Sequence, residues 1–91
     1  MELELTSLIW DEFNITHITK HGVSVEEVET ACRSYIYVDT TYGGRYLLVG
    51  RTNSGRLISI VLTQIDNQYY IITARDSSRG ERKKVYDLEN Q

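Results

Sequence analysis

The chain has 91 residues, a net charge of −3 and one cysteine, which together suit one domain over residues 1–91 with a simple core. The lone Cys32 excludes an internal disulfide and favours a reducing compartment. The acidic Glu2 and Glu4 stand where a signal peptide carries positive charge, and no run approaches the ~20 apolar residues of a membrane-spanning helix. We therefore expect a cytoplasmic protein with no membrane segment.

The charges are unevenly distributed along the chain. Residues 1–40 carry eight acidic and two basic side chains, a net charge of −6, whereas residues 41–91 carry eight basic and five acidic ones, a net charge of +3. This asymmetry predicts an acidic face and a basic face, and the basic face would suit an anionic partner. The alternative is an ordinary solvated surface.

The N-terminal third predicts a strand or arm followed by a helix. Residues 2–9 alternate in polarity, which is typical of a short strand or arm. Asp11 is a good N-cap, and Gly22 can take the left-handed conformation of a Schellman ending. That ending places Lys20 in the last turn and His21 at the C-cap, where positive charge suits the helix dipole.

A second helix is predicted to follow at once. Ser24 and Glu27 form the S-x-x-E pattern of a capping box. One apolar face recurs at steps of three and four residues. Its members are Val25, Val28, Ala31, Cys32 and Tyr35.

From there the apolar period changes to two, and strands are expected. Residues 35–39 are either a short strand or an extended connector, and residues 40–44 form a loop. Three further strands are predicted, at residues 45–51, 56–64 and 68–74, with turn residues between them. Together they indicate an antiparallel meander of three to four strands.

The chain is predicted to close with a third helix. Ser78 and Glu81 form another capping box, and the helix should run to about Leu88. The fold class is therefore α+β: an arm, two helices, the meander and a C-terminal helix.

His17 and His21 lie four residues apart, a spacing compatible with a metal pair, a proton-transfer pair or an ordinary helix end. The stretch reads H-I-T-K-H, so it lacks the glutamate of the H-E-x-x-H metal motif, and no third His or Cys cluster follows. We expect no metal site and no cofactor.

Arginines stand at the predicted strand ends and in the last helix. Their forks bind phosphates bidentately and can stabilise the charge that develops during RNA cleavage. The competing interpretation is that they are charged residues that flank apolar strands and prevent aggregation. Arg75 is the sharpest case, because it is expected directly after an apolar strand, facing the N-terminus of the last helix. There it suits either an anion held jointly with the helix end or a salt bridge, such as one to Glu81.

An ordered series of short motifs over Trp10 to Tyr86 resembles the BrnT family of toxins from bacterial type II toxin–antitoxin systems. The series consists of Trp10-Asp11, Lys20-His21-Gly22-Val23-Ser24 with Glu26-Glu27, Arg45, Gly50, Gly55-Arg56, Ile72-Thr73-Ala74-Arg75, Glu81-Arg82 and Tyr86. The resemblance implies a compact α+β fold related to the RelE-like ribonuclease toxins. It also implies metal-independent RNA cleavage that stalls translation. The implied partner is a ribbon-helix-helix antitoxin, which neutralises the toxin and with it binds the DNA of their own promoter.

The resemblance also implies roles for individual residues. Arg75 and Arg82 would hold the scissile phosphate, Lys20 or His21 would donate a proton, and Tyr86 is a further candidate for that proton. RNA would also be bound by Arg45, Arg51, Arg56, Arg79 and Lys83. Two other functions compete with the toxin: a catalytically weak or inactive module that binds an acidic protein, and a purely structural domain.

Overall fold

The computed structural model describes residues 3, 5 and 7–91, so positions 2, 4 and 6 of the predicted arm lie outside the described residues. The elements are β1 (Leu8–Ile9), α1 (Glu12–Lys20), α2 (Val25–Arg33), β2 (Tyr37–Thr41), η1 (Tyr42–Gly44), β3 (Arg45–Arg51), β4 (Leu57–Ile65), β5 (Gln68–Asp76) and α3 (Arg79–Glu89). This order confirms the predicted α+β class.

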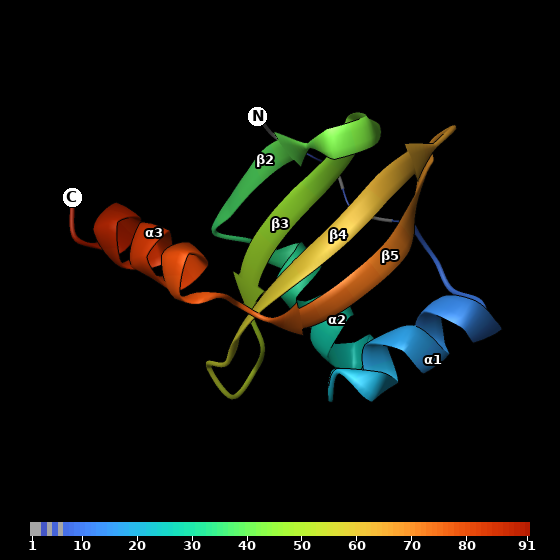
Figure 1. The fold of residues 1–91 in the computed structure, drawn as a ribbon, viewed down its shortest axis with the longest axis horizontal. Helices are drawn as coiled ribbons and strands as arrows, with labels where there is room; N and C mark the ends of the chain where they lie inside the picture. Colours follow the sequence, from blue (N-terminus) through green and yellow to red (C-terminus); the bar gives the residue numbers. More distant parts are fainter. Residues whose placement is uncertain (1–2, 4, 6) are drawn as a thin grey trace.

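All five strands form one sheet with the order β1-β5-β4-β3-β2 (Figure 1). Strands β2 to β5 form an antiparallel meander. The sequence predicts either a strand or a connector at residues 35–39, and the strand β2 lies there, at Tyr37–Thr41. The short β1 pairs in parallel with β5, with Leu8 opposite Tyr69. The N-terminal strand thus adds to the edge of the meander, a pairing that alternation of polarity could not predict.

The predicted strand boundaries are wrong by one or two residues at several places, among them the start of β2 at Tyr37 and the end of β4 at Ile65. Strand β4 begins at Leu57 rather than at Arg56. Strand β5 runs on to Asp76, because its ladder with β4 continues through the Ser59–Arg75 pair. Arg75 is therefore inside the last strand and not after it. Residues 40 and 41 belong to β2, and the predicted loop shrinks to the short η1 turn.

The start and end of α1 follow the predicted local chemistry. The Asp11 side chain accepts from the backbone N–H of Asn14, while the Asn14 side chain accepts from that of Asp11. At the other end, Val23 N–H donates to the Ile18 carbonyl at 3.0 Å, and Gly22 has φ 73°. These two features are the expected Schellman ending, so the corner that carries His21 has a defined shape.

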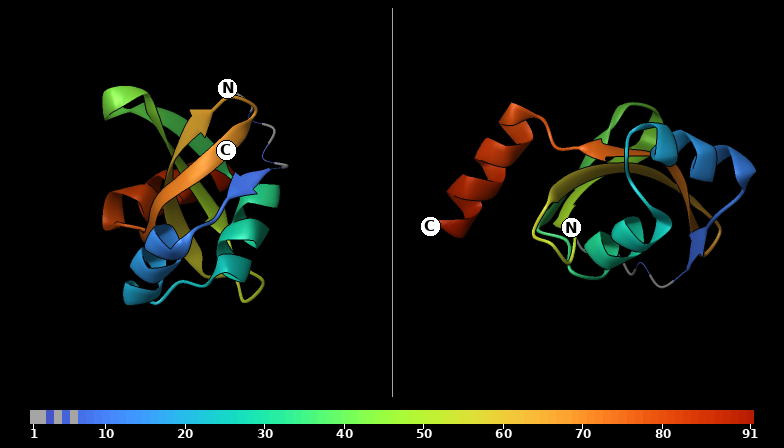
Figure 2. Two further views of the ribbon diagram at one scale, coloured as in Figure 1. Left: turned by 90° about the vertical axis from the view of Figure 1, so that its right-hand side faces the viewer. Right: turned by 90° about the horizontal axis from the view of Figure 1, so that it is seen from below.

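Helix α2 packs on one face of the curved sheet (Figure 2). Its apolar stripe places Val28, Ala31 and Cys32 in the core, and burial raises the pKa of the Cys32 thiol to about 12. Gly50 of β3 lies directly under α2, where an added Cβ atom would stand 2.5 Å from the carbonyl oxygen of Ala31. The helix can approach this closely because position 50 has no side chain.

Helix α3 extends from the end of β5, away from α1 and α2, and carries the C-terminus at its tip (Figures 1 and 2). Val85 is its buried residue. No helix in the described part of the chain is long and apolar enough to cross a membrane.

We predict that Gly50→Ala lowers the free energy of unfolding by about 1–3 kcal/mol, because α2 must move off the sheet to admit a methyl group. Urea denaturation would measure the change. Gly80→Ala is the matched control, since a Cβ atom at position 80 meets nothing within 4 Å. In the first turn of α3 this control should be neutral or stabilise by up to about 1 kcal/mol. Equal stability of the two variants would contradict the packing argument.

Candidate functional site

A row of four residues crosses the sheet on the face opposite α2. The strand registers place Tyr37 opposite Val49, Val49 opposite Ser59, and Ser59 opposite Arg75. The neighbouring residues Ile58 and Ile60 belong to the core beside α2, so alternation along β4 turns Ser59 to the other face. Ser59 is only 1% exposed, and its hydroxyl therefore sits as a buried polar group beneath α3.

The carboxylate of Glu81 lies over this row. Arg75 donates to it through both terminal nitrogens, with Nη1–Oε1 at 2.8 Å and Nη2–Oε2 at 3.1 Å. Ser59 Oγ donates to Oε1 at 2.7 Å, and the backbone N–H of Ser78 donates to the same oxygen at 2.7 Å. Of the two alternatives left open for Arg75, the described residues show the salt bridge to Glu81.

These donors lower the pKa of Glu81 to about 2. The hydrogen bonds from Arg75 contribute most, and burial opposes them by disfavouring the charged form. The backbone N–H of Ser78 and the hydroxyl of Ser59 add to the lowering. Glu81 is therefore ionised at neutral pH, and it presents a negative charge to Arg75.

Arg82 stands on the other side of the same junction. Its Nη1 donates to the backbone carbonyl of Ser77, the residue that follows β5. The hydroxyl of Ser77 lies 2.8 Å from that of Ser59. Ser77, which accepts from Arg82, is therefore linked through Ser59 to Glu81, which accepts from Arg75. Arg75 and Arg82 thus both bond to groups at the junction of β5 and α3.

Arg56 connects the α1–α2 corner to this end of the sheet. Its Nε donates to Asp76 Oδ1 at 2.7 Å, and its Nη1 donates to the Gly22 carbonyl at 2.9 Å and to Glu27 Oε2 at 3.2 Å. Hydrogen bonding to Asp76 raises the pKa of Arg56. One guanidinium therefore holds the corner that follows His21 against the last residue of β5.

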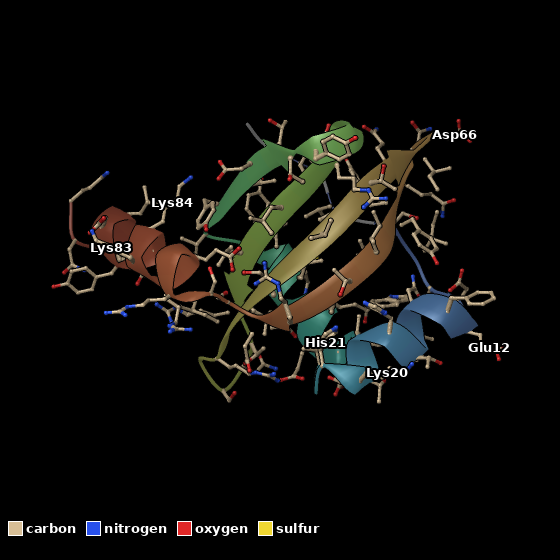
Figure 3. All side chains as sticks on the ribbon, in the orientation of Figure 1. Glu12, Lys20, His21, Asp66, Lys83 and Lys84 are labelled. Atoms are coloured by element: carbon tan, nitrogen blue, oxygen red, sulfur yellow. The ribbon has the colours of Figure 1, made fainter. Side chains whose placement is uncertain are left out.

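Lys20 and His21 lie at this corner, exposed at the end of α1 and below the lower end of the sheet in Figure 3. The ring centroids of His17 and His21 are 5.2 Å apart in an edge-on arrangement. Lys20 borders an open hollow of about 420 Å³ together with Phe13 and other residues of α1. Among the described residues, no group of three or more His, Cys, Asp or Glu could hold a metal ion.

The other predicted RNA-binding residues are spread over the surface. Arg51 pairs with Glu89 at 2.7 Å, and Lys83, labelled on α3 in Figure 3, pairs with Asp87 at 3.0 Å. Arg79 is exposed at the start of α3, and Tyr86 is 66% exposed further along it. Arg45 begins β3, which runs in the same direction as β5, so it lies at the opposite end of the sheet from Arg75.

Four residues near the predicted site are not identified by the sequence analysis: Tyr37, Ser59, Asp76 and Ser77. The signal for Ser59 was present, because it is a small polar residue within the apolar run of β4. Tyr37 gave no comparable signal, although burial and the nearby charges of Glu81 and Asp39 raise its pKa. Its hydroxyl therefore keeps its proton near the arginines.

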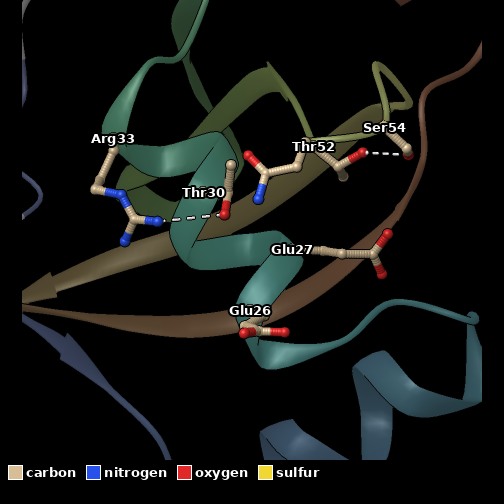
Figure 4. Close-up of a pocket in the computed structure, with 7 residues that line it drawn as sticks. Glu26, Glu27, Thr30, Arg33, Thr52 and Ser54 are labelled. Atoms are coloured by element: carbon tan, nitrogen blue, oxygen red, sulfur yellow. Dashed lines mark hydrogen bonds between the residues drawn. The ribbon is translucent and has the colours of Figure 1, made fainter.

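A separate polar pocket of about 320 Å³ lies between α2 and the turn that joins β3 to β4 (Figure 4). Its lining includes Arg33, which donates to Thr30, and Thr52, which is bonded to Ser54. None of the predicted site residues borders it. Neither Arg75 nor Arg82 borders it, so it is a different site from the junction of β5 and α3.

Comparison with known proteins supports the family predicted from the sequence. A family model described as the ribonuclease toxin BrnT of type II toxin–antitoxin systems matches residues 10–81. The crystal structure of the Brucella abortus ribonuclease toxin BrnT is similar to this chain at a TM-score of 0.64 and 26% identity, covering 81% of this chain and 100% of that chain. No curated protein matches the sequence.

The lowered pKa of Glu81 predicts that the free energy of unfolding falls in acid. Because the folded-state pKa is depressed from 4.5 to about 2, the stabilisation is complete above about pH 5 and is lost as the pH falls toward 2. Glu81→Gln should shrink the loss of unfolding free energy between pH 7 and pH 3, as measured by urea denaturation. Glu26→Gln, a substitution in the first turn of α2, should leave that loss unchanged. An equal loss in all three proteins would contradict the assignment.

The contacts of Arg56 predict a large structural effect for a residue expected to bind RNA. Arg56→Gln should lower the free energy of unfolding by about 2 kcal/mol, because it removes the charged donor that Glu27, Asp76 and the Gly22 carbonyl share. Arg45→Gln is the control, since Arg45 is exposed and should change stability by less than about 0.5 kcal/mol. Thermal melts monitored by circular dichroism would compare the two variants. Equal melting curves would contradict a stabilising role for the Arg56 contacts.

Proposed function

The chain belongs to the BrnT family of ribonuclease toxins of type II toxin–antitoxin systems, and we propose that it cleaves RNA with Arg75 and Arg82 holding the scissile phosphate. The observation that carries this proposal is the state of the Arg75 guanidinium. Glu81 occupies its Nη1–Nη2 end, while the adjacent Nε–H and one N–H of Nη2 have no acceptor among the described residues. These two parallel donors match two oxygens of one phosphate.

The proposed reaction needs only groups that RNA and the protein supply. The 2′-hydroxyl oxygen attacks the adjacent phosphorus, the bond from phosphorus to the 5′-oxygen breaks, and a cyclic phosphate forms. The 2′-hydroxyl loses its proton to solvent or a base, and the leaving 5′-oxygen gains one. Arg75 and Arg82 would stabilise the negative charge that builds on the non-bridging oxygens. We propose that no metal ion takes part.

Lys20 and His21 are the proposed sources of the proton for the leaving oxygen. Both are exposed at the corner that Arg56 holds against β5, so solvent and a long, flexible substrate can reach them. Histidine is the side chain that most often acts as a general acid or base, so His21 suits the role of proton donor. Tyr86 is a lesser candidate, because it follows Arg82 by one helical turn and is largely exposed.

For binding further along the RNA we propose five other cations, which are spread over the surface. They are Arg45, Arg51, Arg56, Arg79 and Lys83. The membership in a type II system implies an antitoxin partner, and we propose a ribbon-helix-helix protein that neutralises the toxin in the cytoplasm and prevents it from inhibiting translation.

Cleavage of a labelled RNA by the purified protein in EDTA tests the proposal. Arg75→Ala should lower kcat on the order of 10²-fold, as removal of one charge-stabilising donor does in other enzymes. Arg75→Lys should also be slow, because a lysine keeps the charge near Glu81 but lacks the fork. Arg33→Ala on α2 is the control and should cleave like the wild type. Cleavage by Arg75→Ala at the wild-type rate, with the fold intact by circular dichroism, would refute the assignment.

A second candidate function is a protein-binding module without ribonuclease activity. It is favoured by the internal pairing of Arg51, Arg56 and Arg75 with carboxylates, which reduces the positive charge offered to RNA. This candidate predicts no RNA cleavage by the wild type, together with binding to an acidic antitoxin that weakens as salt rises. The cleavage assay therefore distinguishes the two functions.

A further inference from the structure

Glu81 differs from an ordinary capping residue in the number of groups that fix it. As the N3 residue of α3 it completes the capping box with Ser78, which needs one of its oxygens. It also receives two hydrogen bonds from Arg75 and one from Ser59, and its side chain is only 14% exposed. Helix α3, strand β4 and strand β5 thus all hold the same carboxylate.

The support beneath this carboxylate is buried and hydrogen-bonded. Ser59 is buried in the middle of the sheet, and its hydroxyl is bonded to both Glu81 and Ser77. The main-chain carbonyl of Asp76 receives a further bond from Arg75 Nη1 at 3.1 Å. The end of the Arg75 side chain is therefore fixed by two acceptors, one from α3 and one from the strand that carries it.

A guanidinium has two edges that can each bind a pair of oxygens: the end formed by both Nη atoms and the side formed by Nε and Nη2. Glu81 takes the end. The side edge is left without an acceptor among the described residues, and the Arg75 side chain is 39% exposed. A phosphate on the side edge would not need to displace Glu81.

From this geometry we infer that Glu81 is a positioning residue that holds the Arg75 guanidinium with its Nε–Nη2 edge turned toward the scissile phosphate. This inference rests on the proposed function. Without the carboxylate, the long Arg75 side chain would sample several rotamers, and the phosphate would meet an edge that is correctly aimed for only part of the time. A misalignment on the order of 1 Å costs about 10²-fold in rate.

Glu81→Gln is the central variant, because glutamine can still accept from the Ser78 N–H and complete the capping box. It removes the charge and one of the two oxygens that Arg75 requires. We expect kcat for RNA cleavage to fall 10- to 100-fold with KM changed less than threefold. Glu26→Gln, the same substitution in the first turn of α2, should cleave like the wild type. Unchanged or increased activity in Glu81→Gln would overturn the inference, an increase meaning that Glu81 competes with the phosphate.

Ser59→Ala provides a second variant that leaves both charges in place. It removes only the hydroxyl that fixes Glu81 Oε1, so kcat should fall by a smaller factor than in Glu81→Gln. If Glu81→Gln fails to fold, this variant decides the question. Wild-type kcat in Ser59→Ala would then overturn the role of the network.

A spectroscopic measurement separates this inference from the proposed function. In ¹H–¹⁵N spectra, a guanidinium held by two acceptors shows slow rotation about its Nε–Cζ bond, and Arg75→Lys identifies the Arg75 signal by its loss. We expect slow rotation in the wild type and fast rotation in Glu81→Gln, and inorganic phosphate should shift the Nε–H signal only in the wild type. If the wild type cleaves no RNA, the proposed function fails while these spectra still test the positioning. Equal rotation and equal phosphate shifts in both proteins would overturn it.

Discussion

The carboxylate of Glu81 determines how the last helix meets the sheet. It caps α3 through Ser78, accepts from Ser59 of β4 and pairs with Arg75 of β5. With Val85 as the buried residue of α3, apolar packing alone offers the helix little to fix its direction. The position of Arg82, one residue further on, therefore follows from where Glu81 is held.

Arg56 has the corresponding role on the other side of the sheet end, and the two networks have opposite polarity. In one a carboxylate gathers donors, and in the other a guanidinium gathers acceptors from α2, the α1–α2 corner and β5. The Arg56 network includes an ion pair to Glu27, which joins the basic part of the chain to the acidic part. The Glu81 network uses the ion pair to Arg75, and both residues lie in the last third of the chain. Some basic side chains of residues 41–91 are therefore neutralised by acidic side chains of residues 1–40, as in the Arg56–Glu27 and Lys84–Asp39 pairs.

The features that could be predicted from the sequence are those determined by neighbours along the chain. The capping boxes at Ser24 and Ser78 and the Schellman ending at Gly22 each depend on residues within one turn, and all three are present. The parallel pairing of β1 and the burial of Ser59 depend on residues about 20 to 60 positions away, which no local pattern contains. For the same reason, Arg75 could be singled out from its position, but the edge that Glu81 leaves open could not.

The limited burial of α3 has a consequence for the dynamics of the site. Elements with few buried apolar contacts open locally at a lower free energy than the sheet to which they attach. Opening of α3 would carry Glu81 and Arg82 away together, while Arg75 would stay on β5. The amide hydrogens of α3 should then exchange with solvent before those of β4, and the two arginines should separate each time the helix opens. Local unfolding of one terminal helix would in this way set how often the two arginines lie at the same junction.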